Sequence, residues 1–470
     1  APDLSFALLG RFPLPPSAIH QPPSSPARGS CQHPMDGCSC TESIFVSVAS
    51  YRDSQCQYTL QDLFEKARRP ERVVAGVCFQ VAAEDEDSFL LDLGPWASQI
   101  RTVFLHHSEA KGPCYARARI QQELFRDEDY YFQIDSHMRF AQDWDEICLQ
   151  QLSSCSPRAV LTTYAGSYTL PGDYKPGQPD QAVLCPNRSV AIICADTFGD
   201  QAQDDPFLRI KTRNSRSDFG HQPPPALFWT ARFAFSRGPV VREVPYDPHL
   251  EYVFFGEEIS MSARLWTSGW DLFNPTKTIA YHLGSRSHRQ WFREVQTSPE
   301  QIQKEQDAKG RICGMLGVEW PAGRRHPPPP APYGLGLSRT LADYERFAGV
   351  DFKRQAVHER GRNGGLSPGL FPPQWAEEER EKVMRATQLL DVQSWAGKGN
   401  SEALSRQFPE LAAADGSAAA GQREGARARE QEAARARELA VFRVQALQSR
   451  LAGLDDEDGT ERDDAELELC

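Results

Sequence analysis

The sequence has no run of about 18 consecutive apolar residues, so it predicts no membrane-spanning helix. Its opening stretch, APDLSFALLGRFPLPPSAIH, lacks the charged region and the long apolar region of a signal peptide. The first methionine is Met35, which leaves open a fragment whose anchor lies upstream. Lys and Arg number 52 against 64 Asp and Glu, and the net charge of −12 argues against a broad nucleic-acid-binding surface.

The paired Cys and His spacing of a structural zinc site is also missing. Cys31, Cys38 and Cys40 cluster, but no second pair follows them at zinc-finger spacing. The rest of the 12 cysteines are scattered along the chain. Scattered cysteines in a long chain are typical of buried thiols rather than of a disulfide framework, which favours a reducing compartment.

Composition divides the chain of 470 residues into four segments. Residues 1–41, rich in Pro, Ser and Gly, predict a flexible lead-in. Residues 42–300 contain the strand and helix patterns, and 301–395 predict an appended helical segment packed on the main domain. Residues 396–470, rich in Ala, Arg and Glu, predict a charged helix with an acidic disordered tail. A partial apolar stripe at 439–451 leaves open a coiled coil for self-association.

The segment 42–300 predicts an α/β domain. Strand patterns occur at 43–50, 72–81, 101–107, 127–135, 159–166, 188–198 and 228–238. Helical patterns occur at 54–70, where Pro70 ends the run, and at 112–125, 144–155 and 255–270. Strands that alternate with helices predict a mixed, mainly parallel sheet flanked by helices.

The strand at 127–135 ends in Asp135-Ser136-His137. Ligands of open α/β sheets bind beyond the carboxyl ends of the strands, and residues i and i+2 project to the same side. A carboxylate and an imidazole that face one point suit Mn²⁺ or a similar divalent ion, and phosphate oxygens of a nucleotide sugar can fill the other positions. The alternative is that Asp135 caps a turn and that His137 is an ordinary packed or surface histidine.

Longer motifs accompany this pair in a fixed order. They are VSVASYRD (46–53), GPCYARARIQQELFRDEDYYFQIDSHMRF (112–140), VFFGEEISMSARLWTSGWDLFNP (253–275) and AYHLGSR (280–286). Together they resemble the family of Skp1-hydroxyproline N-acetylglucosaminyltransferases over about residues 42–300, and PYGLGLSRTLADYERFAGVDF (332–352) is also similar. The resemblance implies a GT-A fold, UDP-GlcNAc as donor, a divalent cation (Mn²⁺, with Mg²⁺ as the alternative) and transfer with retention to a hydroxyproline of a Skp1-like protein.

The resemblance also assigns residues of the donor and metal sites. A distant similarity to polypeptide GalNAc-transferases implies His282 as a third metal ligand beside Asp135 and His137, although a simple histidine at the end of an expected strand, 276–281, is the alternative. The expected donor-binding residues are Ser50, Tyr51, Arg52, Asp53, Arg117, Asp135 and Ser136. Ser50 to Arg52 are expected at uracil or ribose and Arg117 at the diphosphate. Otherwise, Asp53 caps a turn and Arg117 is a surface charge.

FFGEE resembles the segment that holds the transferred sugar in related GT-A enzymes. It makes Glu257 and Glu258 the expected catalytic residues, and helix-terminal acids that complement the helix dipole are the alternative. The expected sugar- or acceptor-binding residues are Gly256, Trp266, Trp270 and Asp271, with buried packing as the alternative for one tryptophan. Because the sequence marks no carboxylate as a nucleophile, we favour front-face transfer, in which the leaving phosphate takes the acceptor proton.

Two other classes of protein compete with this interpretation. A catalytically silent relative would bind a glycan or a partner, but the acidic and histidine set is intact. A metal hydrolase would need more clustered His and Asp ligands. A GT-A enzyme with a different UDP-sugar or acceptor is a further alternative. The resemblance implies a cytoplasmic location, whereas a lost anchor, and the sequon at 187–189, would fit the Golgi lumen.

Overall fold

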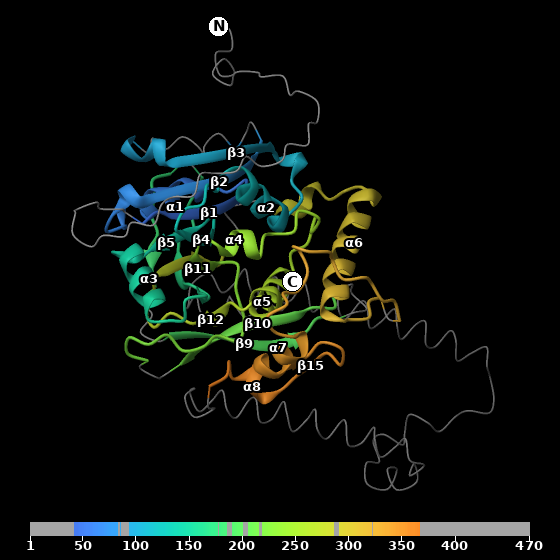
Figure 1. The fold of residues 1–470 in the computed structure, drawn as a ribbon. Helices are drawn as coiled ribbons and strands as arrows, with labels where there is room; N and C mark the ends of the chain where they lie inside the picture. Colours follow the sequence, from blue (N-terminus) through green and yellow to red (C-terminus); the bar gives the residue numbers. More distant parts are fainter. Residues whose placement is uncertain are drawn as a thin grey trace, which may run out of the picture. The chain divides into compact units, whose positions relative to one another are not determined.

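The computed structural model describes residues 42–82, 85, 94–176, 178–185, 190–200, 205–215, 219–285, 291–321 and 323–366 (Figure 1). The lead-in, with Cys31, Cys38 and Cys40, lies outside the described residues, as do the sequon at 187–189 and the charged segment 396–470. Within the described part of the chain, no helix has the length and apolar character needed to cross a membrane.

A mixed, mainly parallel sheet forms the centre of the described residues. Its strands, in spatial order, are β12 (Asp271–Phe273), β6 (Ala159–Thr162), β11 (Phe233–Arg237), β4 (Tyr130–Asp135), β1 (Ile44–Tyr51), β2 (Val73–Val81) and β3 (Ile100–His106). Strand β11 is antiparallel to both neighbours, and the other adjacent pairs are parallel. The fold class expected from the alternation of strands and helices is therefore confirmed.

Both faces of this sheet are covered, which explains why its central strands are apolar throughout. On one face, Phe45 packs in a core with residues of the helices α2 and α5. On the other face, Ile44, Val46 and Val48 pack with residues of α1 and α3. Successive side chains of a strand point to opposite faces, so β1 contributes to both cores. Gly76 of β2 is required here, because a Cβ at this position would lie 2.1 Å from Cζ of Phe45.

The helices lie on both faces of the sheet and beyond its β12 edge (Figure 1). They are α1 (Cys56–Glu65), α2 (Pro113–Glu123), α3 (Trp144–Ser153), α4 (Val240–Glu243), α5 (Glu257–Thr267), α6 (Pro299–Leu316), α7 (Leu341–Ala348) and α8 (Glu359–Arg362).

The expectation that Pro70 ends the first helix is wrong, because α1 ends at Glu65 and Pro70 starts a separate 3-10 turn. The backbone N–H groups of Arg68 and Arg69 donate to the carboxylate of Asp145, at 2.7 and 3.1 Å. These donors therefore bind a side chain of α3 instead of continuing the helical hydrogen bonds.

Three smaller sheets surround the central one. A four-stranded sheet has the order β5 (Met138–Phe140), β13 (Ala280–Leu283), β7 (Gly166–Thr169) and β8 (Val183–Leu184). The two-stranded sheets are β9 (Val190–Phe198) with β10 (Leu208–Ser215), and β14 (Val350–Asp351) with β15 (Ala356–Val357). Strand β13 starts at Ala280, so His282 lies inside a strand and does not follow one as the sequence analysis expected.

The described residues 299–321 and 323–366 contain helices α6, α7 and α8 and the short strands β14 and β15. Helix α6 begins with a capping box between Ser298 and Gln301 and ends at Gly317, whose φ is +69°. Helix α7 is capped in the same way by Thr340 and Asp343. Apolar residues of α6 and α7 share a core with those of α5, so this part of the chain holds α5 from the side away from the central sheet.

A buried ion pair between the 3-10 turn at Pro70–Arg72, just before β2, and helix α3 gives a test of the fold. Asp145, fully buried, binds Arg72 at 2.6 Å and the two backbone N–H groups described above. We expect Asp145→Ala to lower the free energy of unfolding by about 3–5 kcal/mol, because it leaves the buried Arg72 without its main partner. Urea unfolding followed by circular dichroism measures this.

The matched control is Glu71→Ala. It removes the exposed pair between Glu71 and Arg69, for which a change below about 1 kcal/mol is expected. An equal decrease in the free energy of unfolding in both variants would contradict the expectation that the buried pair stabilises the fold more than the exposed pair does.

Candidate functional site

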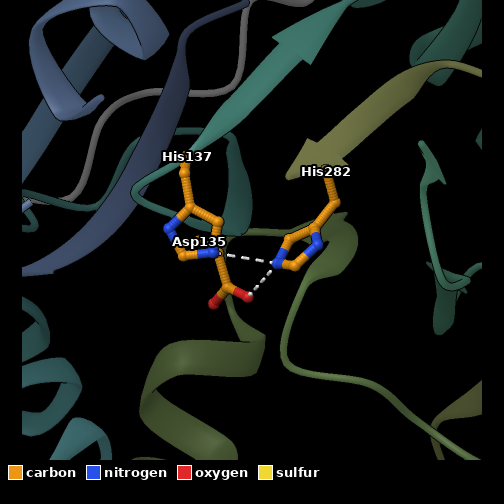
Figure 2. Close-up of side chains that lie close together, drawn as sticks. All are labelled: Asp135, His137 and His282. Carbon is orange, nitrogen blue, oxygen red and sulfur yellow. Dashed lines mark hydrogen bonds and ion pairs between the residues drawn. The ribbon is translucent and has the colours of Figure 1, made fainter. Parts of the chain in front are cut away.

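Asp135, His137 and His282 come together at the carboxyl edge of the central sheet (Figure 2). Asp135 ends β4, and His137 lies in the two-residue connection to β5. Strand β13 pairs with β5 so that His282 is opposite Met138. The bend between β4 and β5, rather than alternation along one strand, therefore turns Asp135 and His137 toward one point.

The donor atoms of these three residues fit one divalent ion. Nε2 of His137 is 2.9 Å from Nε2 of His282, which in turn is 3.4 Å from Oδ2 of Asp135. Two nitrogens that bind one ion at about 2.1 Å and at right angles lie about 3.0 Å apart. One carboxylate oxygen and two imidazole nitrogens suit Mn²⁺ and similar ions, so the set expected from the sequence is present with compatible spacing.

The protonation states also suit metal binding. Burial, followed by the positive charge of Arg232, holds the pKa of His282 well below its usual range. Burial disfavours the Asp135 carboxylate, but a hydrogen bond with His282 and the charge of Arg117 together hold the pKa of Asp135 well below its usual range. A neutral imidazole and an ionised carboxylate are the forms that bind metal ions.

Asp53 lies behind His137 and is almost completely buried. Its Oδ2 accepts from Nδ1 of His137 at 2.7 Å and from Oγ of Ser136 at 2.6 Å, and its Oδ1 accepts from the backbone N–H of Gln55 at 3.0 Å. A carboxylate that accepts the Nδ1–H of a neutral histidine leaves the lone pair on Nε2, the nitrogen that faces His282. Through its bond to Gln55, Asp53 also caps the turn after β1, which was the alternative role predicted for it from the sequence.

Arg117 of α2 joins two carboxylates. Its Nη2 is 2.8 Å from Oδ1 of Asp135, and its Nη1 is 2.5 Å from Oε1 of Glu257. The residue is only 4% exposed, which excludes the alternative of a surface charge. The guanidinium expected at the diphosphate is therefore bound between β4 and α5.

Glu257 and Glu258 occupy the first turn of α5, after Gly256. Gly256 has a φ of +105°, a backbone conformation that residues with a side chain rarely adopt. A Cβ there would also lie 2.9 Å from Phe207, so both the backbone and the available space favour glycine. Glu257 also accepts a hydrogen bond from Tyr246 at 2.6 Å and is buried. The carboxylates lie at the positive end of the helix dipole.

Glu258 differs from Glu257 in its partners and its ionisation. It is partly buried and accepts from the backbone N–H of Ala231 at 3.0 Å and from the hydroxyl of Tyr164 at 2.9 Å. Burial raises the pKa of Glu258 to about 7 against the opposing charge of Arg232. A carboxyl group with this pKa can exchange a proton near neutral pH.

The residues at the end of β1 lie beside this cluster. Ser50 is buried, and its carbonyl accepts from the side chain of Gln80 at 3.3 Å. Tyr51 ends β1. Arg52 has a φ of +46° and forms an ion pair with Asp85 at 2.8 Å.

Trp266, Trp270 and Asp271 lie at the other end of α5, about 16 Å of helix from Glu257. Trp266 stacks on Phe347 of α7 with ring centroids 5.3 Å apart. The buried Trp270 donates to Glu243 at 3.0 Å, and Asp271 binds Arg339 at 2.6 Å. The structure therefore does not bring these three residues to the cluster, and both tryptophans pack against the protein.

Two further residues of the site, Tyr164 and Tyr246, bind the two glutamates and were not predicted from the sequence. Tyr164 lies between β6 and β7, and Tyr246 lies between α4 and α5. Neither belongs to a recognisable motif, because each tyrosine meets its glutamate only through the tertiary fold.

Comparison with known proteins identifies a family and more distant structures. The model of the family described as "Glycosyltransferase (GlcNAc)" matches residues 43–93 and 95–354, more than half of the chain. No curated protein matches the sequence significantly.

Among solved structures, the chain is similar to GalNAc-T7 with UDP, GalNAc and Mn²⁺ (TM-score 0.43, 13% identity), covering 60% of this chain and 48% of that one. It thus spans about half the length of GalNAc-T7. It is also similar to S. aureus TarS 1–349 in complex with UDP-GlcNAc (TM-score 0.33, 11% identity, 58% and 70% covered). A third match is the mannosyltransferase PcManGT from Pyrobaculum calidifontis with GDP-Man and Mn²⁺ (TM-score 0.32, 8% identity, 57% and 69% covered).

The contact between Asp53 and His137 predicts an effect on metal affinity. In Asp53→Asn, the amide is a weaker acceptor for the Nδ1–H and no longer supplies negative charge behind the imidazole. We expect Mn²⁺ affinity to fall about 10- to 100-fold. Isothermal titration calorimetry with Mn²⁺ alone measures this without turnover.

Ser136→Ala is the control for Asp53→Asn, since it removes the other side-chain donor to the same carboxylate oxygen. Mn²⁺ affinity in this control should stay near that of the wild type. Unchanged affinity in Asp53→Asn would show that the contact does not support a metal ligand.

Proposed function

Because the chain belongs to the glycosyltransferase (GlcNAc) family, we propose that it transfers N-acetylglucosamine from UDP-GlcNAc to a protein hydroxyl with the help of a divalent cation. The observation that carries this proposal is the cluster of Asp135, His137 and His282, which lies next to Arg117 and Glu257 at the carboxyl edge of the sheet. Ligands of open α/β sheets bind at this edge. A GT-A type of fold agrees with the mixed, mainly parallel sheet.

Asp135, His137 and His282 would hold the cation, for which we propose Mn²⁺. When bound, the cation supplies positive charge that stabilises the diphosphate of the donor as the sugar leaves. Asp53 orients His137 from behind, and Arg117 orients the carboxylate of Asp135. These residues act by fixing the ligand geometry before the donor arrives.

Glu258 is the better placed of the two glutamates to face the transferred sugar. Glu257 is held by Arg117 and Tyr246, so its role is to position them. Glu258 is partly buried and has a pKa of about 7. It can accept hydrogen bonds from sugar hydroxyls and stabilise positive charge at the anomeric carbon. Ser50 and Tyr51, which end β1 just before Asp53, would serve the uracil or ribose.

The proposed transfer is retaining and proceeds on the front face. The bond between the anomeric carbon and the phosphate oxygen breaks, and both electrons stay on that oxygen. The acceptor oxygen forms the new bond, and its proton passes to the departing diphosphate. Three observations support front-face attack: Asp135 and Glu257 are both bound to Arg117, and Glu258 accepts hydrogen bonds from Ala231 and Tyr164.

The finer parts of the proposal come from the sequence motifs. We propose a hydroxyproline of a Skp1-like protein as acceptor, a catalytic segment over 42–300 with 301–395 appended to it, and a cytoplasmic location. A silent relative that only binds a glycan or partner is the second candidate. The complete set of metal-binding side chains favours an enzyme over this candidate.

Donor hydrolysis tests the proposed activity. We expect slow release of UDP from UDP-GlcNAc that requires Mn²⁺, and Asp135→Ala should reduce it at least about 100-fold, because a metal ligand and the partner of Arg117 are both lost. A coupled assay for UDP measures the rate. The control is Asp129→Ala, at the exposed residue just before the same strand, which should keep wild-type activity.

Release of UDP that survives Asp135→Ala would place the metal site elsewhere. If the wild type neither turns over any UDP-sugar nor binds UDP in a metal-dependent way, the silent relative becomes the better description.

The acceptor is tested with a pair of peptides that differ in one oxygen. We expect transfer of GlcNAc to a Skp1-derived peptide with hydroxyproline and none to the same peptide with proline, because the attacking atom is the ring hydroxyl. Mass spectrometry detects the added sugar. Transfer to serine or threonine peptides with no preference for hydroxyproline would show that another protein hydroxyl is the acceptor.

A further inference from the structure

Arg232 lies at the carboxyl edge of the sheet, outside the sequence motifs that carry the family resemblance. The expected strand at 228–238 begins only at Phe233. Before it, the N–H of Thr230 donates to Oγ1 of Thr162 at 2.9 Å and the N–H of Ala231 to Glu258 at 3.0 Å. Strand β11 is antiparallel to β4, with Phe233 opposite Ile134. One step further along this register, Arg232 is opposite Asp135.

The side chain of Arg232 is supported by the same residues that bind Glu258. Its guanidinium carbon lies 4.6 Å from the centroid of the Tyr164 ring. The hydroxyl of Tyr164 donates to Oε2 of Glu258 at 2.9 Å. Stacking on a ring restrains the plane of a guanidinium while its N–H groups point outward within that plane. Arg232 is partly exposed, whereas Arg117 is buried between two carboxylates.

The electrostatic influence of Arg232 reaches both sides of the candidate site. Its charge helps to lower the pKa of His282 on β13 and opposes the rise in the pKa of Glu258 on α5. The guanidinium of Arg232 therefore acts on a proposed metal ligand and on the proposed sugar-binding carboxylate.

The charges of the loaded site are nearly balanced, so an anion needs a positive group that faces it. A divalent ion, Arg117 and Arg232 together carry four positive charges. Asp53, Asp135, Glu257 and Glu258 carry four negative charges, or three when Glu258 is protonated. Asp53 is buried behind His137 and Glu257 is buried beside Arg117, whereas Arg232 is partly exposed. An anion that enters a partly buried site is unfavourable unless a positive group pairs with it. The diphosphate of a nucleotide sugar carries two negative charges and gains a third when the sugar departs.

We propose that Arg232, stacked on Tyr164 opposite Asp135, binds the diphosphate of the nucleotide sugar and stabilises the charge that develops on it as the glycosidic bond breaks. This inference rests on the proposed function and moves the diphosphate contact from Arg117 to Arg232. Arg117 then acts as a positioning residue that holds Asp135 and Glu257. Arginine suits the task because its planar donors can bind two phosphate oxygens at once.

The test compares ligands that differ in their phosphates. UDP and uridine are titrated calorimetrically, in Mn²⁺, into the wild type, Arg232→Gln and Arg232→Lys. We expect Arg232→Gln to lower the affinity for UDP about 10- to 100-fold, because the variant loses charge-assisted hydrogen bonds to the phosphates. The affinity for uridine should be unchanged. Arg232→Lys keeps the positive charge but not the paired N–H donors. Its affinity for UDP should therefore lie between that of the wild type and that of Arg232→Gln.

Mn²⁺ titrated alone provides a readout that a loss of structure would not reproduce. Removal of a neighbouring positive charge should leave Mn²⁺ affinity equal to or higher than that of the wild type, while UDP affinity falls. A misfolded variant would lose both. In donor hydrolysis, the effect should fall on kcat more than on KM, since the charge on the diphosphate grows in the transition state.

Arg237→Gln is the matched control. Arg237 ends the same strand and lies over a tyrosine ring, that of Tyr130, at 5.6 Å, but at the opposite edge of the sheet. It should behave as the wild type in every titration. UDP binding in Arg232→Gln as tight as in the wild type would overturn the inference and leave the proposed function intact. If the wild type itself fails to bind UDP with Mn²⁺, the proposed function fails, and the inference fails with it.

Discussion

The contact of Arg117 with Asp135 and Glu257 is the interaction on which the candidate site depends. It joins helix α2 and the strand that follows it, β4, to helix α5, whose Glu257 lies 140 residues after Arg117. Two carboxylates this close would repel each other in a poorly solvated site, and a buried guanidinium without partners would be equally unfavourable. Each group is stable in its place because the other two are there. The orientation of α5, and with it that of Glu258, follows from this arrangement.

A second layer of buried polar groups supports His137. Asp53, at the end of β1, binds His137 and at the same time accepts from the backbone at the start of α1. The side chains that face the site are thus held by partners on rigid strands and helix ends. Such support reduces the rearrangement needed when charge develops in a reaction. Partners of this kind are individually unremarkable in the sequence.

Much of the fold and part of the site could be predicted from local patterns. The strands and helices alternate visibly, and Asp135, His137 and Glu257 occur in short motifs at element boundaries. Predictions that depended on where a helix leads in space, or on contacts between residues distant in the sequence, were less successful. Trp266, Trp270 and Asp271 follow Glu257 closely in the sequence, but a straight helix carries them away from the cluster. The end of α1 depends on Asp145, which lies 80 residues after Glu65 in the printed sequence.

By itself, the sequence determined which residue types lie at the ends of strands. A buried strand is visible as an apolar run, and the polar residues that follow the run mark its end. Several motifs in one order also indicated a GlcNAc glycosyltransferase, which agrees with the family model that matches residues 43–93 and 95–354. Only the tertiary structure decided which charges meet. Arg117 is bound to two carboxylates, Asp53 lies behind His137, and Arg232 is opposite Asp135. Electrostatic interactions depend on distance in space and on burial, and neither is encoded in the spacing of residues along the chain.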